Sequence, residues 1–146
     1  MKRITFVFAA CLLTSTLVAQ QLSEPILQSA QMPMYPVIAR FARVTGEVVA
    51  EFTLDDSGSV ASVQILSGPQ LLWRATQENI QTWKFQIPKK STEANQEYKT
   101  TFTYRFSGRE VEGDEESGKA LKLTVTVSSF HEIEVISDTY KPTMQY

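Results

Sequence analysis

The sequence contains one cysteine and one histidine among its 146 residues, and this scarcity excludes several kinds of enzyme. Cys11 lies in an apolar amino-terminal segment, whereas His131 lies near the carboxyl terminus. A Cys/His pair needs both side chains in one site, and Ser/His catalysis needs a histidine positioned as the base. We expect His131 to be a surface or edge residue of a strand. The sequence therefore predicts no enzyme, no catalytic residue and no cofactor.

An excess of basic charge is also missing. The chain carries 14 basic and 16 acidic residues, a formal net charge of −2 at pH 7. Nucleic-acid-binding domains gather Lys and Arg on one face, and no such cluster is visible in the sequence. The acidic residues between Glu110 and Glu116 lack the spaced Asp/Asn ligands and the closing Glu of a calcium loop. The sequence thus predicts neither a nucleic-acid partner nor a metal site.

Long apolar runs are absent, apart from Ile4–Ala19, which follows the basic pair Lys2–Arg3. As a helix this run would reach about 24 Å, which is less than the roughly 30 Å hydrocarbon core of a bilayer. A positive tip, a short apolar run and small residues near its end are typical of a secretory signal peptide. Residues 1–20 are therefore predicted to be a signal peptide.

Two alternatives to a cleaved leader stay open. Cleavage after Ala19 or Gln20 is the favoured prediction, but residues 4–19 could instead act as a short membrane anchor. Lipidation at Cys11 is the third alternative, although Phe8 stands where a lipid-attachment motif usually has Leu. On the favoured reading the mature protein has no thiol, which suits an oxidising compartment.

The first elements of the mature chain are short. Residues 21–32 form a polar lead-in without strong periodicity. Pro36 suits the first position of a helix, because the N–H that proline lacks would have no partner there. A helix of about two turns is predicted over residues 37–43, and it ends before Gly46.

A β-hairpin and an amphipathic helix follow. Apolar and polar residues alternate over residues 47–54 and again over residues 59–66, which is typical of half-buried strands. The cluster Asp55–Gly58 between them is a turn signal, and together these segments predict a hairpin. The next helix is predicted over Gln70–Trp83. Its apolar stripe comprises Leu72, Ala75, Thr76, Ile80 and Trp83.

The second half of the chain predicts further strands. Alternation is cleanest over Tyr98–Phe106, and residues 109–119 then form an acidic, solvated loop. Residues 120–137 alternate again, either as one long strand or as two strands broken at Ser128–Ser129, and we favour the break. We expect Leu121–Val135 to supply at least one strand that pairs antiparallel with Tyr98–Phe106. Residues 138–146 are predicted to be a loose tail.

This order of elements predicts the α+β class. Two strands, a helix and a further strand, with a carboxy-terminal strand extension, form two layers: an antiparallel sheet and an amphipathic helix packed on it. Composition and periodicity predict this architecture, but they do not predict a function.

A set of residues accompanies these elements in order: Tyr35 and Pro36, Gly46 before the first long strand, Gly58 in the hairpin turn, Trp83 and Phe85 at the end of the helix, and the final aromatic strand. Together, in this order and spacing, they resemble the carboxy-terminal domain of TonB-family energy transducers. The resemblance covers residues 33–108, about half of the chain. We expect these motif residues to serve packing and backbone geometry rather than chemistry.

The resemblance implies that the protein binds other proteins. In TonB proteins this domain grips a short segment of an outer-membrane transporter, the TonB box, as a strand added to the edge of the sheet. It implies a protein or peptide partner, no small-molecule substrate, and a periplasmic or otherwise exported location in a Gram-negative cell envelope. The implied donor edge in this chain is the strand that carries Tyr98, Thr100, Phe102, Tyr104 and Phe106.

Two departures from the family pattern define an alternative. The apolar segment after residue 120 could fold back and cover the donor edge. The transducers also use a membrane helix with a histidine and a proline-rich linker, whereas here the one histidine is His131 and the six prolines are scattered. The alternative is a periplasmic interaction or scaffold protein that uses the TonB fold with its edge strand self-capped and no energy transduction.

Overall fold

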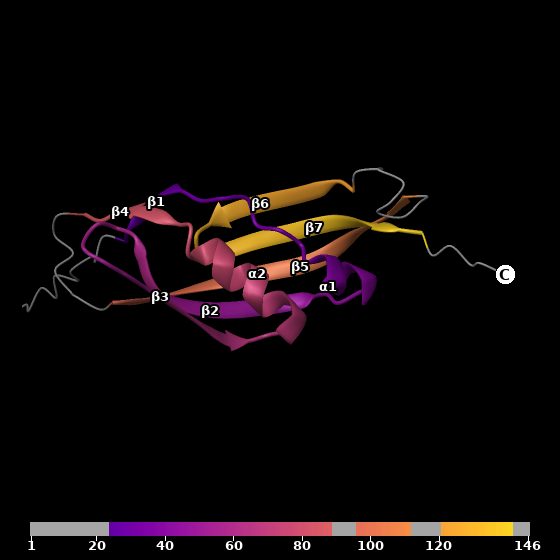
Figure 1. Ribbon diagram of the computed structural model, residues 1–146. Coiled ribbons are helices and arrows are strands. Elements are labelled where there is room, and N and C mark those ends of the chain that lie inside the picture. Colours follow the sequence, from indigo (N-terminus) through magenta and orange to yellow (C-terminus); the bar gives the residue numbers. More distant parts are fainter. Residues whose placement is uncertain (1–23, 89–95, 112–120, 142–146) are drawn as a thin grey trace, which may run out of the picture.

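The computed structural model describes residues 24–88, 96–111 and 121–141, which build a curved main sheet, a small second sheet and two helices (Figure 1). The predicted leader, residues 112–119 of the predicted acidic loop and the end of the predicted tail lie outside the described residues. The elements are β1 (Ile26–Ser29), α1 (Val37–Phe41), β2 (Gly46–Leu54), β3 (Val60–Ser67), α2 (Gln70–Ile80), β4 (Lys84–Gln86), β5 (Glu97–Val111), β6 (Leu123–Ser129) and β7 (Glu132–Tyr140).

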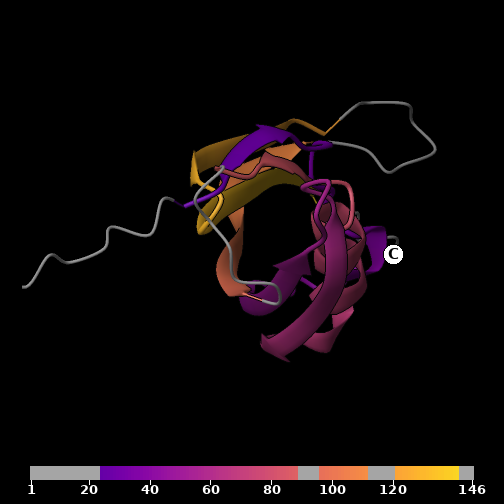
Figure 2. The same ribbon diagram turned by 90° about the vertical axis from the view of Figure 1, so that its left-hand side faces the viewer.

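The main sheet has the strand order β3-β2-β5-β7-β6. β2 pairs antiparallel with both β3 and β5, and β6 pairs antiparallel with β7. The pairing of β5 with β7 is parallel. Viewed along the strands, the main sheet curls around α2, which lies on its concave side (Figure 2). The described elements thus form the predicted α+β arrangement of a helix packed on a sheet.

The predicted hairpin is confirmed, and its turn is held by one carboxylate. Asp55 Oδ1 accepts hydrogen bonds from the backbone N–H groups of Ser57 and Ser59, at 2.9 and 3.0 Å. The Ser57 hydroxyl also donates to it, at 2.6 Å, and these bonds hold the pKa of Asp55 below its usual range. The turn closes at Gly58, whose φ of +80° favours glycine.

The helix α2 buries the predicted stripe but is shorter than predicted. Leu72, Thr76 and Ile80 are buried, and Ala75 is partly exposed. The helix ends at Ile80 rather than at Trp83, since the N–H groups of Thr82 and Trp83 bond to carbonyls three residues back. Such bonds tighten the last turn and end the α-helical pattern.

The strands β1 and β4 were not predicted from the sequence. β1 lies in the segment predicted to be a polar lead-in without strong periodicity, and β4 follows directly on Trp83. They form a separate two-stranded sheet with Leu27 opposite Phe85. Strands of three and four residues are too short to show a period of two, so periodicity does not detect them.

The core is aromatic and draws on the carboxy-terminal strands as well as on the earlier ones. Phe52, Trp83 and Phe102 are fully buried at its centre. Phe130 and Ile133 from the end of the chain are also buried in it. Phe130 packs edge-to-face against Phe85, with ring centroids 5.2 Å apart. The carboxy-terminal strands therefore complete the core.

The prediction of a wholly antiparallel sheet is wrong at one place. The break near Ser128–Ser129 is found, as β6 ends at Ser129 and β7 begins at Glu132. The strand that pairs with β5 is β7, however, and it runs parallel to β5 instead of antiparallel. β7 takes the inner position and buries Ile133 and Val135 in the core, whereas β6 lies at the edge of the sheet and is mostly exposed.

Two predicted boundaries also differ from the structure. β5 continues to Val111, so the first residues of the predicted acidic loop are strand. β7 continues to Tyr140, and Asp138 and Thr139 in the predicted tail are buried. Both extensions are polar, so their composition predicts a loop and a tail. In the structure they pair with each other as strands, with Glu110 opposite Thr139 and Val111 opposite Tyr140.

Candidate protein-binding edge

The backbone of β5 lies between two neighbouring strands. On one side, β2 pairs with it from Gly46 opposite Tyr104 to Thr53 opposite Glu97. On the other side, β7 pairs with it from Thr101 opposite Glu132 to Phe106 opposite Ser137. The N–H of Thr101 also donates to the carbonyl of His131, at 2.8 Å. The edge that the family resemblance implies is therefore filled by the chain itself from Thr101 to Phe106.

The aromatic face of β5 points into the core. Its side chains are buried except that of Phe106, which is half-buried, so they present no surface to a partner. Phe102 stacks on Trp83, with ring centroids 5.9 Å apart. The Tyr104 hydroxyl lies 3.0 Å from the Thr76 hydroxyl of α2. The residues of this face are Tyr98, Thr100, Phe102, Tyr104 and Phe106.

Polar contacts join β5 to β7 along the pairing. Arg105 and Glu134 form an ion pair of 2.5 Å, and the Ser107 hydroxyl donates to Asp138 Oδ1 at 2.6 Å. The ion pair is partly exposed and adds little by itself. Asp138 is buried, so its hydrogen bond from Ser107 matters more. These contacts fix the register in addition to the backbone ladder.

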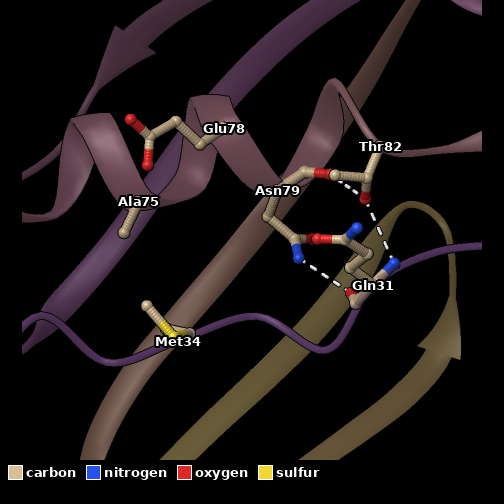
Figure 3. Close-up of a pocket in the computed structure, with 6 residues that line it drawn as sticks. All are labelled: Gln31, Met34, Ala75, Glu78, Asn79 and Thr82. Carbon is tan, nitrogen blue, oxygen red and sulfur yellow. Dashed lines mark hydrogen bonds between the residues drawn. The ribbon is translucent and has the colours of Figure 1, made fainter.

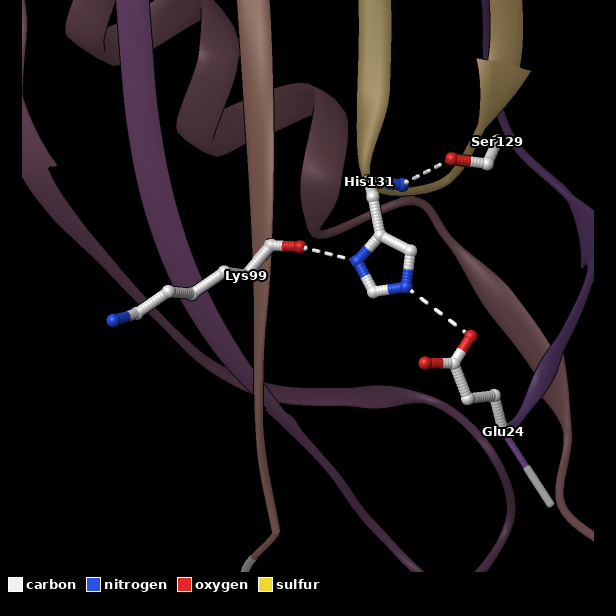
Figure 4. Close-up of polar contacts among 4 residues, drawn as sticks. All are labelled: Glu24, Lys99, Ser129 and His131. Carbon is white, nitrogen blue, oxygen red and sulfur yellow. Dashed lines mark hydrogen bonds and ion pairs between the residues drawn. The ribbon is translucent and has the colours of Figure 1, made fainter. Parts of the chain in front are cut away.

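His131 lies in the turn between β6 and β7 and connects three segments (Figure 4). Its Nδ1 lies 2.9 Å from the carbonyl oxygen of Lys99, and its Nε2 lies 3.3 Å from Glu24 Oε2. Its backbone N–H donates to the Ser129 hydroxyl at 3.2 Å. The ring is exposed, and its contacts join the turn to β5 and to the residues before β1.

The motif residues near the start of the domain have structural contacts. The Tyr35 hydroxyl donates to the carbonyl of Val44 at 2.5 Å, and its ring stacks on Phe106 with centroids 5.1 Å apart. Burial raises the pKa of Tyr35 to about 12. Pro36 is the residue before α1. Gly46 has a φ of +144°, and a side chain there would meet the ring of Pro69 at 3.0 Å.

The remaining motif residues hold β4 against the hairpin turn. A Cβ on Gly58 would lie 1.9 Å from the carbonyl oxygen of Phe85, a distance that no side chain permits. The same two residues are joined by a hydrogen bond from the Phe85 N–H to the Gly58 carbonyl, at 2.8 Å. Trp83 is fully buried, and its indole N–H donates to Asn79 Oδ1 at 3.0 Å. Each motif residue therefore serves the fold.

Residues 31–107, just over half of the chain, match the pattern of a protein family described as "Gram-negative bacterial TonB protein C-terminal". The chain belongs to this family. The family is a non-catalytic domain associated with TonB-dependent transport in the envelope of Gram-negative cells. A comparison with curated proteins finds no match.

A solved TonB structure is similar to this chain. The solution NMR structure of the Pseudomonas aeruginosa TonB carboxy-terminal domain is 20% identical, with a TM-score of 0.47. The match covers 63% of this chain and 94% of that one. In this TonB-family chain β6 and β7 follow the residues matched by the family, so β7, which fills the β5 edge, lies beyond the family pattern.

A small pocket beside α2 is the other candidate site (Figure 3). Its volume is ≈ 150 Å³, below the roughly 300–1,000 Å³ of usual small-molecule sites. Asn79 Nδ2 donates to the Gln31 carbonyl at 2.8 Å, and the Gln31 N–H donates to Thr82 Oγ1 at 3.1 Å. These bonds attach the segment before α1 to the helix. The lining residues are Gln31, Met34, Ala75, Glu78, Asn79 and Thr82.

Other kinds of site find no support in the described part of the chain. No three His, Cys, Asp or Glu residues lie close enough together there to hold a metal ion. No helix within residues 24–88, 96–111 and 121–141 is long and apolar enough to cross a membrane.

The sequence analysis did not identify Asn79, the buried polar residue that joins Gln31 to Trp83. Its position four residues before Trp83 is the one signal that could have identified it.

Proposed function

We propose that the protein is an exported, non-enzymatic interaction module of the Gram-negative envelope that uses the TonB fold with its β5 edge self-capped. In this proposal it binds another protein, but not by adding a TonB-box strand beside Tyr98–Phe106. The observation that carries the proposal is the parallel pairing of β5 with β7. Family membership supports a transport-associated setting and a protein partner.

Strand addition requires unpaired N–H and C=O groups along one edge of a strand. On the β7 side of β5, these groups are already paired from Thr101 to Phe106. A peptide could bind there only after β7 had left. The energetic cost of that departure decides whether β7 acts as a displaceable cover.

Displacing β7 would expose core residues. Ile133 and Val135 are almost completely buried, and each fully buried aliphatic side chain contributes about 1.5–3 kcal/mol. The Ser107–Asp138 hydrogen bond and the Phe130 contacts would also be lost. The sum is comparable to the whole stability of a small domain, about 5–15 kcal/mol. A short peptide does not offset such a loss, so the β5 edge is closed.

The test is an NMR titration of the full chain with TonB-box peptides of outer-membrane transporters. We expect no saturable change in the amide signals of Tyr98–Phe106. Shifts confined to another surface would support an interaction module and locate its partner site. Saturable shifts along Tyr98–Phe106 would contradict the closed edge and favour the transport function with strand addition at β5.

A pair of variants sharpens the titration. Ile133→Ala loosens β7 at a buried position, whereas Val127→Ala changes an exposed residue of β6. If β7 is what excludes the peptide, Ile133→Ala should bind it more tightly than Val127→Ala, with circular dichroism showing that both remain folded. If both variants and the unmodified chain bind the peptide measurably and equally, β7 does not exclude the peptide from the β5 edge.

A further inference from the structure

Closing the β5 edge moves the free edge of the sheet to β6. Within the described residues β6 pairs only with β7 and ends the main sheet, along the upper border in Figure 1. Edge strands of natural proteins are usually protected by charge, proline or bulges. The strand Leu123–Ser129 has neither charge nor proline, and its register is regular from Leu123 to Val127.

The direction of each β6 amide follows from one hydrogen bond. The N–H of Asp138 donates to the carbonyl of Lys122 at 3.1 Å, although Leu123 is the residue opposite Ser137. In an antiparallel ladder this pattern makes Leu123–Ser137 a non-hydrogen-bonded pair. The direction of the backbone groups alternates along β6. The N–H and C=O groups of Thr124 and Thr126 therefore bond to β7, and those of three other residues point outward. These are Leu123, Val125 and Val127.

We propose that β6 binds β6 of a second copy of this chain, antiparallel, about a two-fold axis at Val125. In this register Val125 lies opposite Val125 of the second copy, and Leu123 lies opposite Val127. Each of these pairs exchanges two hydrogen bonds, so that all the outward groups of Leu123, Val125 and Val127 find partners. Two main sheets then join into one continuous sheet.

The chemistry of the strand favours a second copy over a foreign peptide. The outward residues are placed symmetrically about Val125, which is what a self-complementary, two-fold interface requires. The strand carries no charge, so no like charges meet, and Lys122 comes opposite the uncharged Ser128. Val127, which is 53% exposed, gains a cross-strand contact with Leu123 of the other copy.

The opposite edge of the main sheet is less suited to this pairing. β3 is also uncharged, but its register with β2 shifts near both ends, at Val49/Ala50 and at Thr53/Leu54. Such irregularities twist an edge and disturb a regular ladder. The Ser59–Lys84 bridge also covers the start of β3. On the described edge strands of the main sheet, the longest stretch of regular register is therefore Leu123–Val127. This dimer goes beyond the proposed function, since it concerns a different edge and a different partner.

The test is the mass of the full chain in sedimentation equilibrium over about a thousandfold range of concentration. We expect monomers to convert to dimers as the concentration rises. Val127→Pro removes an outward N–H and no bond to β7, so it should remain folded and monomeric throughout. The matched control Val127→Thr keeps the N–H and the β-branched shape, and it should dimerise like the unmodified chain.

A second variant and hydrogen exchange provide two further tests of the dimer. If Val127→Pro does not fold, Val127→Lys takes its place, and it should weaken the dimer at least about tenfold by adding a charge at an uncharged interface. In the unmodified dimer, hydrogen exchange at the amides of Leu123, Val125 and Val127 should slow as concentration rises. A chain that stays monomeric at every concentration overturns the proposal, and so does a folded Val127→Pro or Val127→Lys variant that dimerises like the control. A TonB-box peptide that fails to bind β5 leaves the dimer unaffected, so the two proposals fail independently.

Discussion

Replacing Trp83 by alanine should destabilise the protein more than most single changes. Trp83 is fully buried and packs against Phe52 and Phe102, with ring centroids 5.6 and 5.9 Å away. Truncating a buried Trp costs about 3–5 kcal/mol through lost burial and the remaining cavity. The change also removes the indole donor from Asn79, and an orphaned buried acceptor costs about 1–3 kcal/mol. We therefore expect a loss in the upper part of the 3–5 kcal/mol range.

Urea denaturation followed by circular dichroism measures this loss, since it does not depend on the fluorescence of the residue removed. The second tryptophan supplies a matched control. Trp73 is 36% exposed, and its indole donates to the Gly68 carbonyl at 2.8 Å. Trp73→Ala should cost about 1 kcal/mol, the worth of a single hydrogen bond. A loss below about 1 kcal/mol for Trp83→Ala, or equal losses for both variants, would mean that the core is misplaced.

Two smaller predictions concern buried hydroxyls. Thr100 Oγ1 is buried and has no hydrogen-bond partner among the described residues, whereas the Thr76 hydroxyl bonds to the Leu72 carbonyl and lies beside the Tyr104 hydroxyl. In urea denaturation Thr100→Val should leave the free energy of unfolding unchanged or raise it, whereas Thr76→Val should lower it by about 1–2 kcal/mol. The reverse order would mean that Thr100, and not Thr76, makes the stabilising hydrogen bond. Burial raises the pKa of Tyr35 from 10.0 to about 12, so the folded state favours the neutral form of this side chain. The resulting contribution to the free energy of unfolding is present below pH 10 and is lost as the pH rises towards 12. Thermal unfolding should show this decline, and Tyr35→Phe should make it shallower.

Local chemistry explains the parts of the fold that the sequence could predict. The Asp55–Gly58 turn follows from a side chain that binds its own backbone and from a glycine that tolerates positive φ. The buried face of α2 follows from a helical period that places Leu72, Thr76 and Ile80 on one side. These signals lie within a few residues of each other, so no knowledge of the rest of the chain is needed.

The neighbours of β5 could not be predicted in the same way. Alternation in residues 120–137 indicates which side chains face the core, but it does not indicate which strand lies beside β5 or in which direction it runs. In the structure β7 takes the inner place and buries Ile133 and Val135. The resemblance to TonB domains pointed to the residues of β5 as a binding edge, because the family pattern ends before β7.

The central claim is that β7 fills the edge of β5, and hydrogen exchange of β5 amides tests it most directly. Because the N–H of Thr101 points to β7, the amides of Thr103 and Arg105 do so too, whereas those of Phe102 and Tyr104 point to β2. The account predicts slow exchange at all five amides in the full chain. Slow exchange at Phe102 and Tyr104 with fast exchange at Thr101, Thr103 and Arg105 would show an open edge and would contradict it.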